Sequence, residues 1–81
     1  MIRSLGPPCR ITYDALPGVE LAPEHILRTH VRHRLWLVLT ARRVRSKHPT
    51  RFALEVVSID PRTSLGGRRV HSLVWYPRGR R

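Results

Sequence analysis

The 81-residue sequence has few acidic residues, few aromatic residues and one cysteine. The single cysteine, Cys9, excludes a disulfide within the chain and a cysteine-based zinc site. The longest apolar run, Leu35–Leu39, is far shorter than the roughly 20 residues of a membrane-spanning helix. Residues 1–8 have no apolar segment typical of a secretory signal. We therefore expect a cytoplasmic protein that does not contact a membrane.

Positive charge dominates the composition. There are 16 basic residues against 5 acidic ones, which gives a net charge of +11. All the basic residues except Lys47 are arginine, and no acid lies between Glu24 and Glu55 or after Asp60. Arginine offers planar, bidentate donors that suit phosphates and bases. The expected partner is a DNA or RNA phosphate backbone, and the alternative is an acidic protein surface.

The chain is expected to form a single small basic domain over residues 1–81. Residues 1–8 are predicted to be a loose arm because Gly6-Pro7-Pro8 blocks regular structure, and residues 77–81 a basic tail. The hydrophobic fraction of 41% suffices for one modest core. A core of this size contributes only about 3–5 kcal/mol, so a homodimer would be one way to extend it.

Strand patterns account for most of the sequence. The run from Leu35 is apolar and rich in tryptophan, valine and threonine, which favours a buried strand. Further along the chain, Phe52, Leu54 and Val56 alternate with residues that would face the other side. Pro77 ends the last such segment. We expect strands over residues 10–13, 35–41, 51–59 and 68–76.

Residues 23–33 fit two descriptions. Pro23 followed by Glu24 is typical of the first turn of a helix. The spacing of Leu27 and Val31 also fits a strand, which we favour. The expected fold is then all-β, an antiparallel meander that closes into a small SH3-like or OB-like barrel. A short helix at 23–33 would make it α+β.

The loop between the strands at 35–41 and 51–59 concentrates positive charge. A rigid hairpin tip of this kind can follow a phosphate backbone, and six phosphate contacts would give a slope of log K against log salt of about −5. Trp75, beside the basic tail, would either stack a base or pack in the core. The predicted nucleic-acid-binding residues are Arg42, Arg43, Arg45, Lys47, His48, Arg51, Trp75, Arg78, Arg80 and Arg81.

Evidence for catalysis is weak. His25, His30 and His33 are close in sequence, but only Glu24 lies near enough to complete a metal site, so we expect no metal and no cofactor. Cys9 has no histidine positioned to activate it, and no glycine-rich phosphate loop is present. We therefore expect a protein that is not an enzyme. A metal-free endoribonuclease that uses these histidines as acid and base is the third hypothesis.

Several short segments of the sequence resemble small basic proteins of phages and mobile elements that have no assigned function. They are Tyr13–Val19, Leu35–Val38 with Ala41–Ser46, and Trp75–Arg78. The resemblance implies a location in the host cytoplasm. It also implies the runner-up function, which is a phage-type protein-binding inhibitor of a host complex or a structural component of a particle.

A second resemblance concerns the fold. Leu21-Ala22-Pro23, followed by Leu35-Trp36, is similar to the entry of SH3-like barrels. The Gly-Asp usual at that entry is replaced here by Pro23-Glu24-His25. The resemblance implies the same barrel as the strand pattern.

Overall fold

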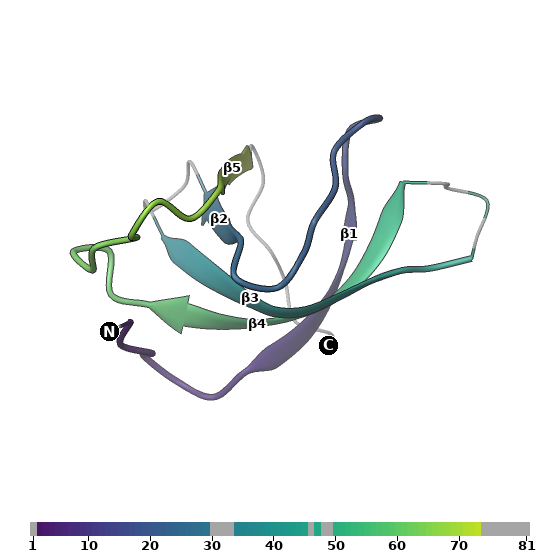
Figure 1. Cartoon of the computed structure of the whole chain (residues 1–81). Helices are drawn as coiled ribbons and strands as arrows, with labels where there is room; N and C mark the ends of the chain where they lie inside the picture. The colour runs from purple at the N-terminus through teal and green to yellow at the C-terminus, as the bar shows by residue number, and fades with distance from the viewer. Residues whose placement is uncertain (1, 30–33, 46, 48–49, 74–81) are drawn as a thin grey trace.

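The computed structural model describes residues 2–29, 34–45, 47 and 50–73, and these form one five-stranded sheet (Figure 1). The strands are β1 (Cys9–Asp14), β2 (Ile26–Thr29), β3 (Leu35–Arg43), β4 (Arg51–Ile59) and β5 (Val70–Leu73). No helix occurs in these ranges, so the all-β expectation is confirmed. The alternative of a helix at 23–33 is wrong at residues 26–29, and residues 30–33 lie outside the description.

The strand predictions are confirmed except at residues 23–25 and 68–69, which lie in connections and not in strands. β4 spans the predicted residues 51–59, while β1 and β3 extend slightly beyond their predicted ends. β3 and β4 pair antiparallel as the expected hairpin, and β1 pairs antiparallel with β4. Residues 70–73 of the predicted last strand form β5, and the rest of that prediction after residue 73 lies outside the described residues.

The predicted meander is wrong at β5. The sheet order is β1-β4-β3-β2-β5, and β5 lies parallel to β2 and not antiparallel to β4. The physical reason is the connection over residues 60–69, which is longer than the two to five residues of an ordinary hairpin loop. Gly66 and Gly67 take positive φ there, and the chain crosses to the free edge of β2 (Figure 1).

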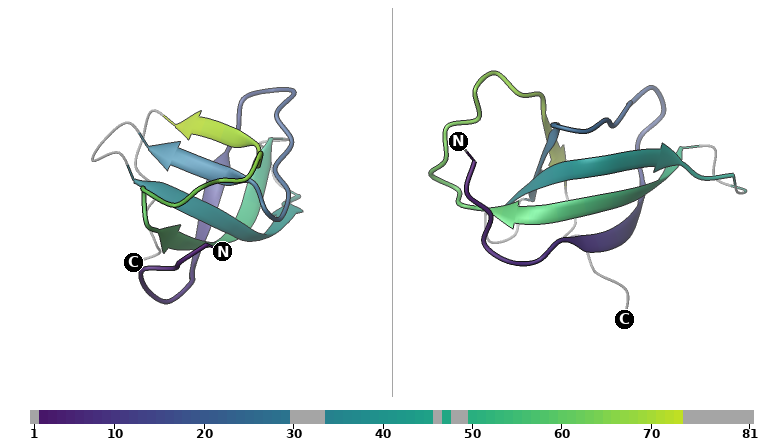
Figure 2. Two further views of the ribbon diagram at one scale, coloured as in Figure 1. Left: turned by 60° about the vertical axis from the view of Figure 1, so that its left-hand side comes forward. Right: turned by 60° about the horizontal axis from the view of Figure 1, so that its bottom comes forward.

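Closure into an SH3-like or OB-like barrel is also corrected by this topology. β1 and β5 are the two edges of the sheet, and no described residues pair these strands with each other. The sheet is strongly curved, as the views in Figure 2 show, but it remains open between its edges.

The concave, inner face of the sheet carries the main core. Phe52, Leu54 and Val56 of β4 pack there with residues of β1 and β3, and all three are buried. Trp36 belongs to the same cluster, as the sequence predicted. The full set of buried members is Ile11, Ala15, Leu21, Leu27, Trp36, Val38, Phe52, Leu54 and Val56.

The opposite, outer face is divided into two parts. Near the end of β4, a second buried cluster contains Ile26, Leu37 and Ile59, with Ile2 and Leu65 packed against it. The N-terminal arm is fixed at this end, because the Leu5 backbone N–H donates to the Ser58 carbonyl at 2.7 Å. The part of the outer face nearer the β3–β4 turn has no such cover.

A β-bulge in β3 determines which side chains of this strand lie on the uncovered part of the outer face. Val38 pairs with Val56 and Thr40 with Glu55, so Leu39 is one residue more than β4 can match. The extra residue reverses the alternation, because side chains in a strand point to opposite faces in turn. Arg42 therefore lies on the outer face, in register with Ala53.

Candidate nucleic-acid interface

Arg42 and Arg43 are adjacent in the chain but lie on opposite faces of the sheet. Arg43 is in register with Phe52 on the inner face, and its guanidinium lies 4.8 Å from the centre of the Phe52 ring. Its Nη2 also donates to Glu20 Oε2 at 2.7 Å. Arg43 is thus held by an aromatic ring and a carboxylate, and it contributes to the fold of the inner face.

Arg51 is similarly engaged. Its Nε and Nη2 donate to the two carboxylate oxygens of Asp14 at 2.7 and 3.1 Å. This bidentate pair joins β1 to β4, and the hydrogen bond to Asp14 raises the pKa of Arg51. Two of the cations predicted to bind phosphate are therefore already neutralised by acids of the same chain.

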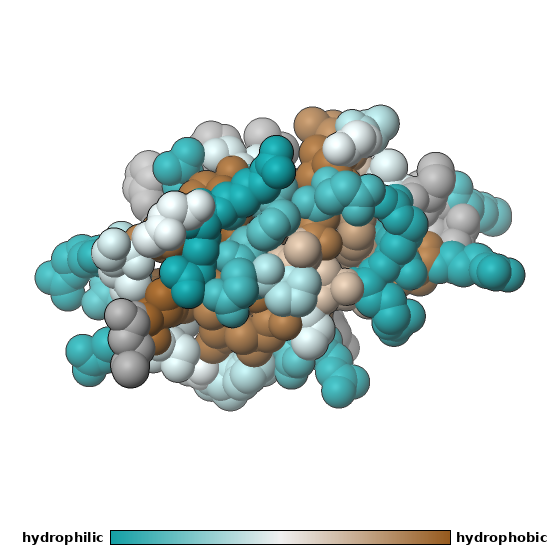
Figure 3. All heavy atoms as spheres, viewed as in Figure 1, coloured by the Kyte–Doolittle hydropathy of each residue, from teal (hydrophilic) through white to brown (hydrophobic). Residues whose placement is uncertain are grey.

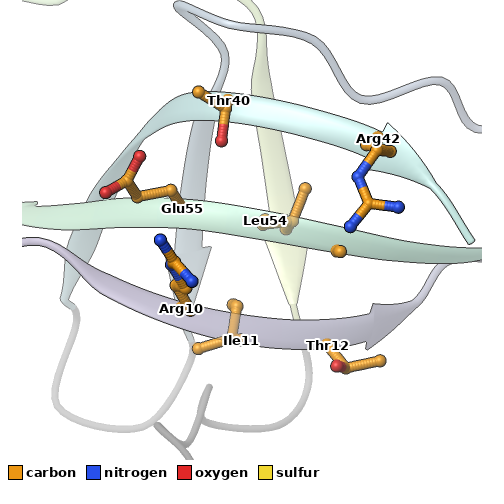
Figure 4. Close-up of a pocket in the computed structure, with 8 residues that line it drawn as sticks. Arg10, Ile11, Thr12, Thr40, Arg42, Leu54 and Glu55 are labelled. Atoms are coloured by element: carbon orange, nitrogen blue, oxygen red, sulfur yellow. The ribbon is translucent and has the colours of Figure 1, made fainter.

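The open part of the outer face forms a hollow of about 780 Å³ across β1, β4 and β3 (Figure 4). Arg10 and Thr12 lie on β1, and Thr40 and Arg42 lie on β3. We call this the sheet-face hollow. Its outer-face residues are Arg10, Thr12, Thr40, Arg42, Ala53 and Glu55.

Register arranges these residues in two rows across the three strands. Arg10, Glu55 and Thr40 form one row, with Glu55 in the middle. Thr12, Ala53 and Arg42 form the next row. Ala53, in the middle of the second row, has a short side chain, and Arg10 and Arg42 stand at diagonally opposite ends of the two rows.

The electrostatics of the hollow differ from those of the rest of the chain. Asp14, Glu20, Glu24 and Asp60 each pair with an arginine within 4.0 Å. Neither Arg10 nor Arg42 has an ion-pair partner among the described residues, and the same holds for Glu55. The hollow therefore presents two available guanidinium groups and one available carboxylate.

The tip of the β3–β4 hairpin continues from the hollow. Arg45 and Lys47 are exposed there, and hydrophilic side chains gather over this end of the molecule (Figure 3). The backbone N–H of Val44 donates to the Arg51 carbonyl at 2.9 Å, which extends the ladder beyond β3. The remaining predicted site residues lie outside the described residues: His48, Trp75, Arg78, Arg80 and Arg81.

Sequence reasoning missed part of this site. Arg10, Thr12, Thr40 and Glu55 are not among the predicted residues. Arg10 and Thr12 are distant from the basic loop in the sequence, and Thr40 and Glu55 lie beside it but carry no positive charge. The signal that was available is their place in the strand patterns, since Arg10 and Thr12 flank the buried Ile11. Only the pairing of β1 with β4 brings them opposite Glu55 and Ala53.

No described aromatic ring lies on the outer face. Trp36 and Phe52 belong to the inner core, and the partly buried Tyr13 packs against it. Burial raises the pKa of the Tyr13 phenol. The described part of the site therefore offers charged and hydrogen-bonding groups and no aromatic ring for stacking.

The histidine cluster expected from the sequence is arranged differently. His25 Nδ1 lies 3.0 Å from Nε2 of His71 on β5, and the two ring centres are 5.0 Å apart. Such a nearly end-to-end contact is typical of a hydrogen bond between imidazoles. Burial, then the neighbouring His25, lower the pKa of His71. His30 and His33 lie outside the described residues.

This second polar cluster joins two parts of the chain, residues 24–28 in and before β2 and residues 68–72 in and before β5. Arg68 pairs with Glu24 at 2.9 Å, and Arg28 Nη2 donates to Ser72 Oγ at 3.0 Å. Glu24 has a φ of 75°, and its ion pair helps to offset the strain of that conformation. Within the described ranges, no three histidine, cysteine or acidic residues are grouped for a metal, and no helix is able to span a membrane.

Comparison with protein families, curated proteins and solved structures found no match for this chain.

Proposed function

We propose that the protein is a non-enzymatic module that binds the phosphate backbone of nucleic acid through the sheet-face hollow and the tip of the β3–β4 hairpin. The observation that carries the proposal is the pair Arg10 and Arg42. They lie on one exposed face with no ion-pair partner among the described residues, although the chain pairs arginines with four of its five acids. Cations left available in this way are free to contact phosphates.

The surrounding residues support the same proposal. The hydroxyls of Thr12 and Thr40 add donors between the two arginines, and Arg45 and Lys47 extend the charge past the end of the sheet. The strands hold these side chains in fixed register, which reduces the ordering that binding requires. The basic tail, with Arg78, Arg80 and Arg81, is a further predicted contact.

The test is fluorescence anisotropy with labelled single- and double-stranded DNA and RNA over a series of salt concentrations. We expect the double variant R10A/R42A to weaken binding at least tenfold. On a duplex it should also make the slope of log K against log salt shallower by about 1.8, because each lost phosphate contact removes about 0.9. Thermal unfolding should be little changed, since both side chains are on the surface.

The matched control is R62A/R69A. It removes the same two charges from the loop that follows β4, where both side chains are exposed. We expect a smaller loss of affinity, from net charge alone. Equal losses in the two double variants would contradict the assignment of the interface. An absence of binding to all four nucleic acids at physiological salt would overturn the proposal and favour an acidic protein partner.

A further inference from the structure

Glu55 is the unusual residue of the sheet-face hollow. It is the single acid of the chain that forms no ion pair among the described residues, and it lies half-buried in β4, on the same face as Arg10 and Arg42. Arg10 and Thr40 are its direct neighbours in register, yet Arg10 does not come within 4.0 Å of its carboxylate. Phosphate contacts do not explain Glu55, because a carboxylate repels phosphate.

A ligand that suits the whole hollow must present donors to Glu55 and acceptors to the arginines. An ionised carboxylate accepts hydrogen bonds and donates none, whereas guanidinium and hydroxyl groups supply the donors. Among the nucleobases, guanine presents two adjacent donors, N1–H and the 2-amino group, that match both oxygens of a carboxylate. Its O6 and N7 are acceptors that arginine contacts in a bidentate manner.

We propose that the hollow recognises an unpaired guanine, with Glu55 accepting hydrogen bonds from its Watson–Crick edge and Arg10 or Arg42 donating to O6 and N7. This inference rests on the proposed function and adds a base preference to it. It requires single-stranded nucleic acid, because the Watson–Crick edge is occupied in a duplex.

The dimensions of the hollow agree with this assignment. Side chains directly opposite in an antiparallel pair are about 5 Å apart and diagonal ones about 7–8 Å, so groups on β1 and β3 both reach a base held over β4. The short side chain of Ala53 lies two residues from Glu55 on the same face of β4, and the volume of about 780 Å³ lies within the range of small-molecule sites. The arginine that does not contact the base edge offers a planar surface against which the base can stack.

The test uses seven-nucleotide single strands, as both DNA and RNA, in which thymidines (uridines in RNA) surround one central guanine, adenine, cytosine or thymine (uracil in RNA). Anisotropy at low salt gives the affinities. We expect the guanine strand to bind about tenfold more tightly than the others. Inosine, which lacks the 2-amino group, and 7-deazaguanine, which lacks N7, should each lose much of that preference.

The variant E55Q separates this inference from the proposed function. It should lose most of the guanine preference, because the hydrogen bonds from N1–H and the 2-amino group need both carboxylate oxygens. It should bind the thymine strand no more weakly than the unaltered protein does, because one negative charge is lost. E24Q is the control, since Glu24 pairs with Arg68 away from the hollow and its loss removes the same charge. E24Q should keep the guanine preference.

Three outcomes would overturn the inference. Equal binding of all four strands, or a guanine preference that is as large in E55Q as in the unaltered protein, would contradict the base assignment and leave the backbone-binding proposal standing. A lack of binding to any strand would contradict both. Thermal unfolding of E55Q, expected to resemble that of the unaltered protein because Glu55 is partly exposed, shows that the variant is folded.

Discussion

Arginine side chains lie on both faces of the sheet, but their surroundings differ. On the inner face, Arg43 lies over Phe52 and pairs with Glu20. On the outer face, Arg42 lies beside Ala53 with no ion-pair partner among the described residues. One position in the sequence separates an arginine that stabilises the fold from one that is available to a ligand. The density of basic residues along a chain therefore overstates the charge that a ligand meets.

The largest difference expected between the faces is in stability. Phe52 is 3% exposed in the inner core, and Phe52→Ala should cost about 3–5 kcal/mol through lost contacts and a residual cavity. That cost is comparable with the whole stability of a domain of this size, so the variant should be largely unfolded. Urea unfolding followed by circular dichroism measures it. Ala53→Ser, on the outer face, is the control and should change stability by less than about 0.5 kcal/mol. Similar effects at both positions would contradict the two-face description.

A smaller difference should separate the neighbouring arginines. Arg43→Ala removes an ion pair and a cation–π contact, and we expect it to lower the free energy of unfolding by about 1 kcal/mol. Arg42→Ala should change it by less than about 0.5 kcal/mol, because no described residue depends on that side chain. If Arg42→Ala destabilised the protein more than Arg43→Ala, Arg42 would have a structural role, which would contradict the comparison of the two faces.

The smallest effect expected is on the pH dependence of stability. It concerns His71 on β5, away from the two arginines compared above. The pKa of His71 is lowered in the folded state, so below its ordinary value of 6.5 the unfolded chain binds more protons than the folded one. The stability that neutral His71 contributes is present above pH 6.5 and is lost as the pH falls from there towards the lowered pKa. His71→Gln should flatten the melting temperature across this window. An unchanged pH profile would contradict the role assigned to the pair with His25.

Much of the fold follows from local sequence. The alternation of Phe52, Leu54 and Val56 predicts both β4 and its buried face, and the apolar run from Leu35 predicts β3. The prediction of β4 holds because its residues 52, 54 and 56 alternate towards one buried face. The prediction of β3 holds because residues 35–38 are buried on both faces of the sheet, which requires a continuous apolar run. The same pattern, without further information, favours a strand over a helix at Ile26–Thr29.

The rest depends on long-range pairing. The bulge at Leu39 is not marked by a glycine or a proline in the sequence. It allows both Val38, before the bulge, and Ala41, after it, to face the inner core. Without the bulge, alternation from Trp36 would place Arg42 inside and Arg43 outside. The parallel pairing of β5 with β2 cannot be predicted from local sequence either, because the two strands are far apart in the chain. The resemblance to phage proteins and the expected cytoplasmic location stay predictions.

We propose that Arg42 contacts the nucleic acid, whereas Arg43 stabilises the fold. The most direct test compares the salt dependence of nucleic-acid binding by Arg42→Ala and Arg43→Ala, which remove the same charge from adjacent positions. We predict that Arg42→Ala weakens binding to a duplex and reduces the slope of log K against log salt by about 0.9, whereas Arg43→Ala leaves the slope unchanged. Equal slopes for the two variants, or the larger loss in Arg43→Ala, would contradict the account.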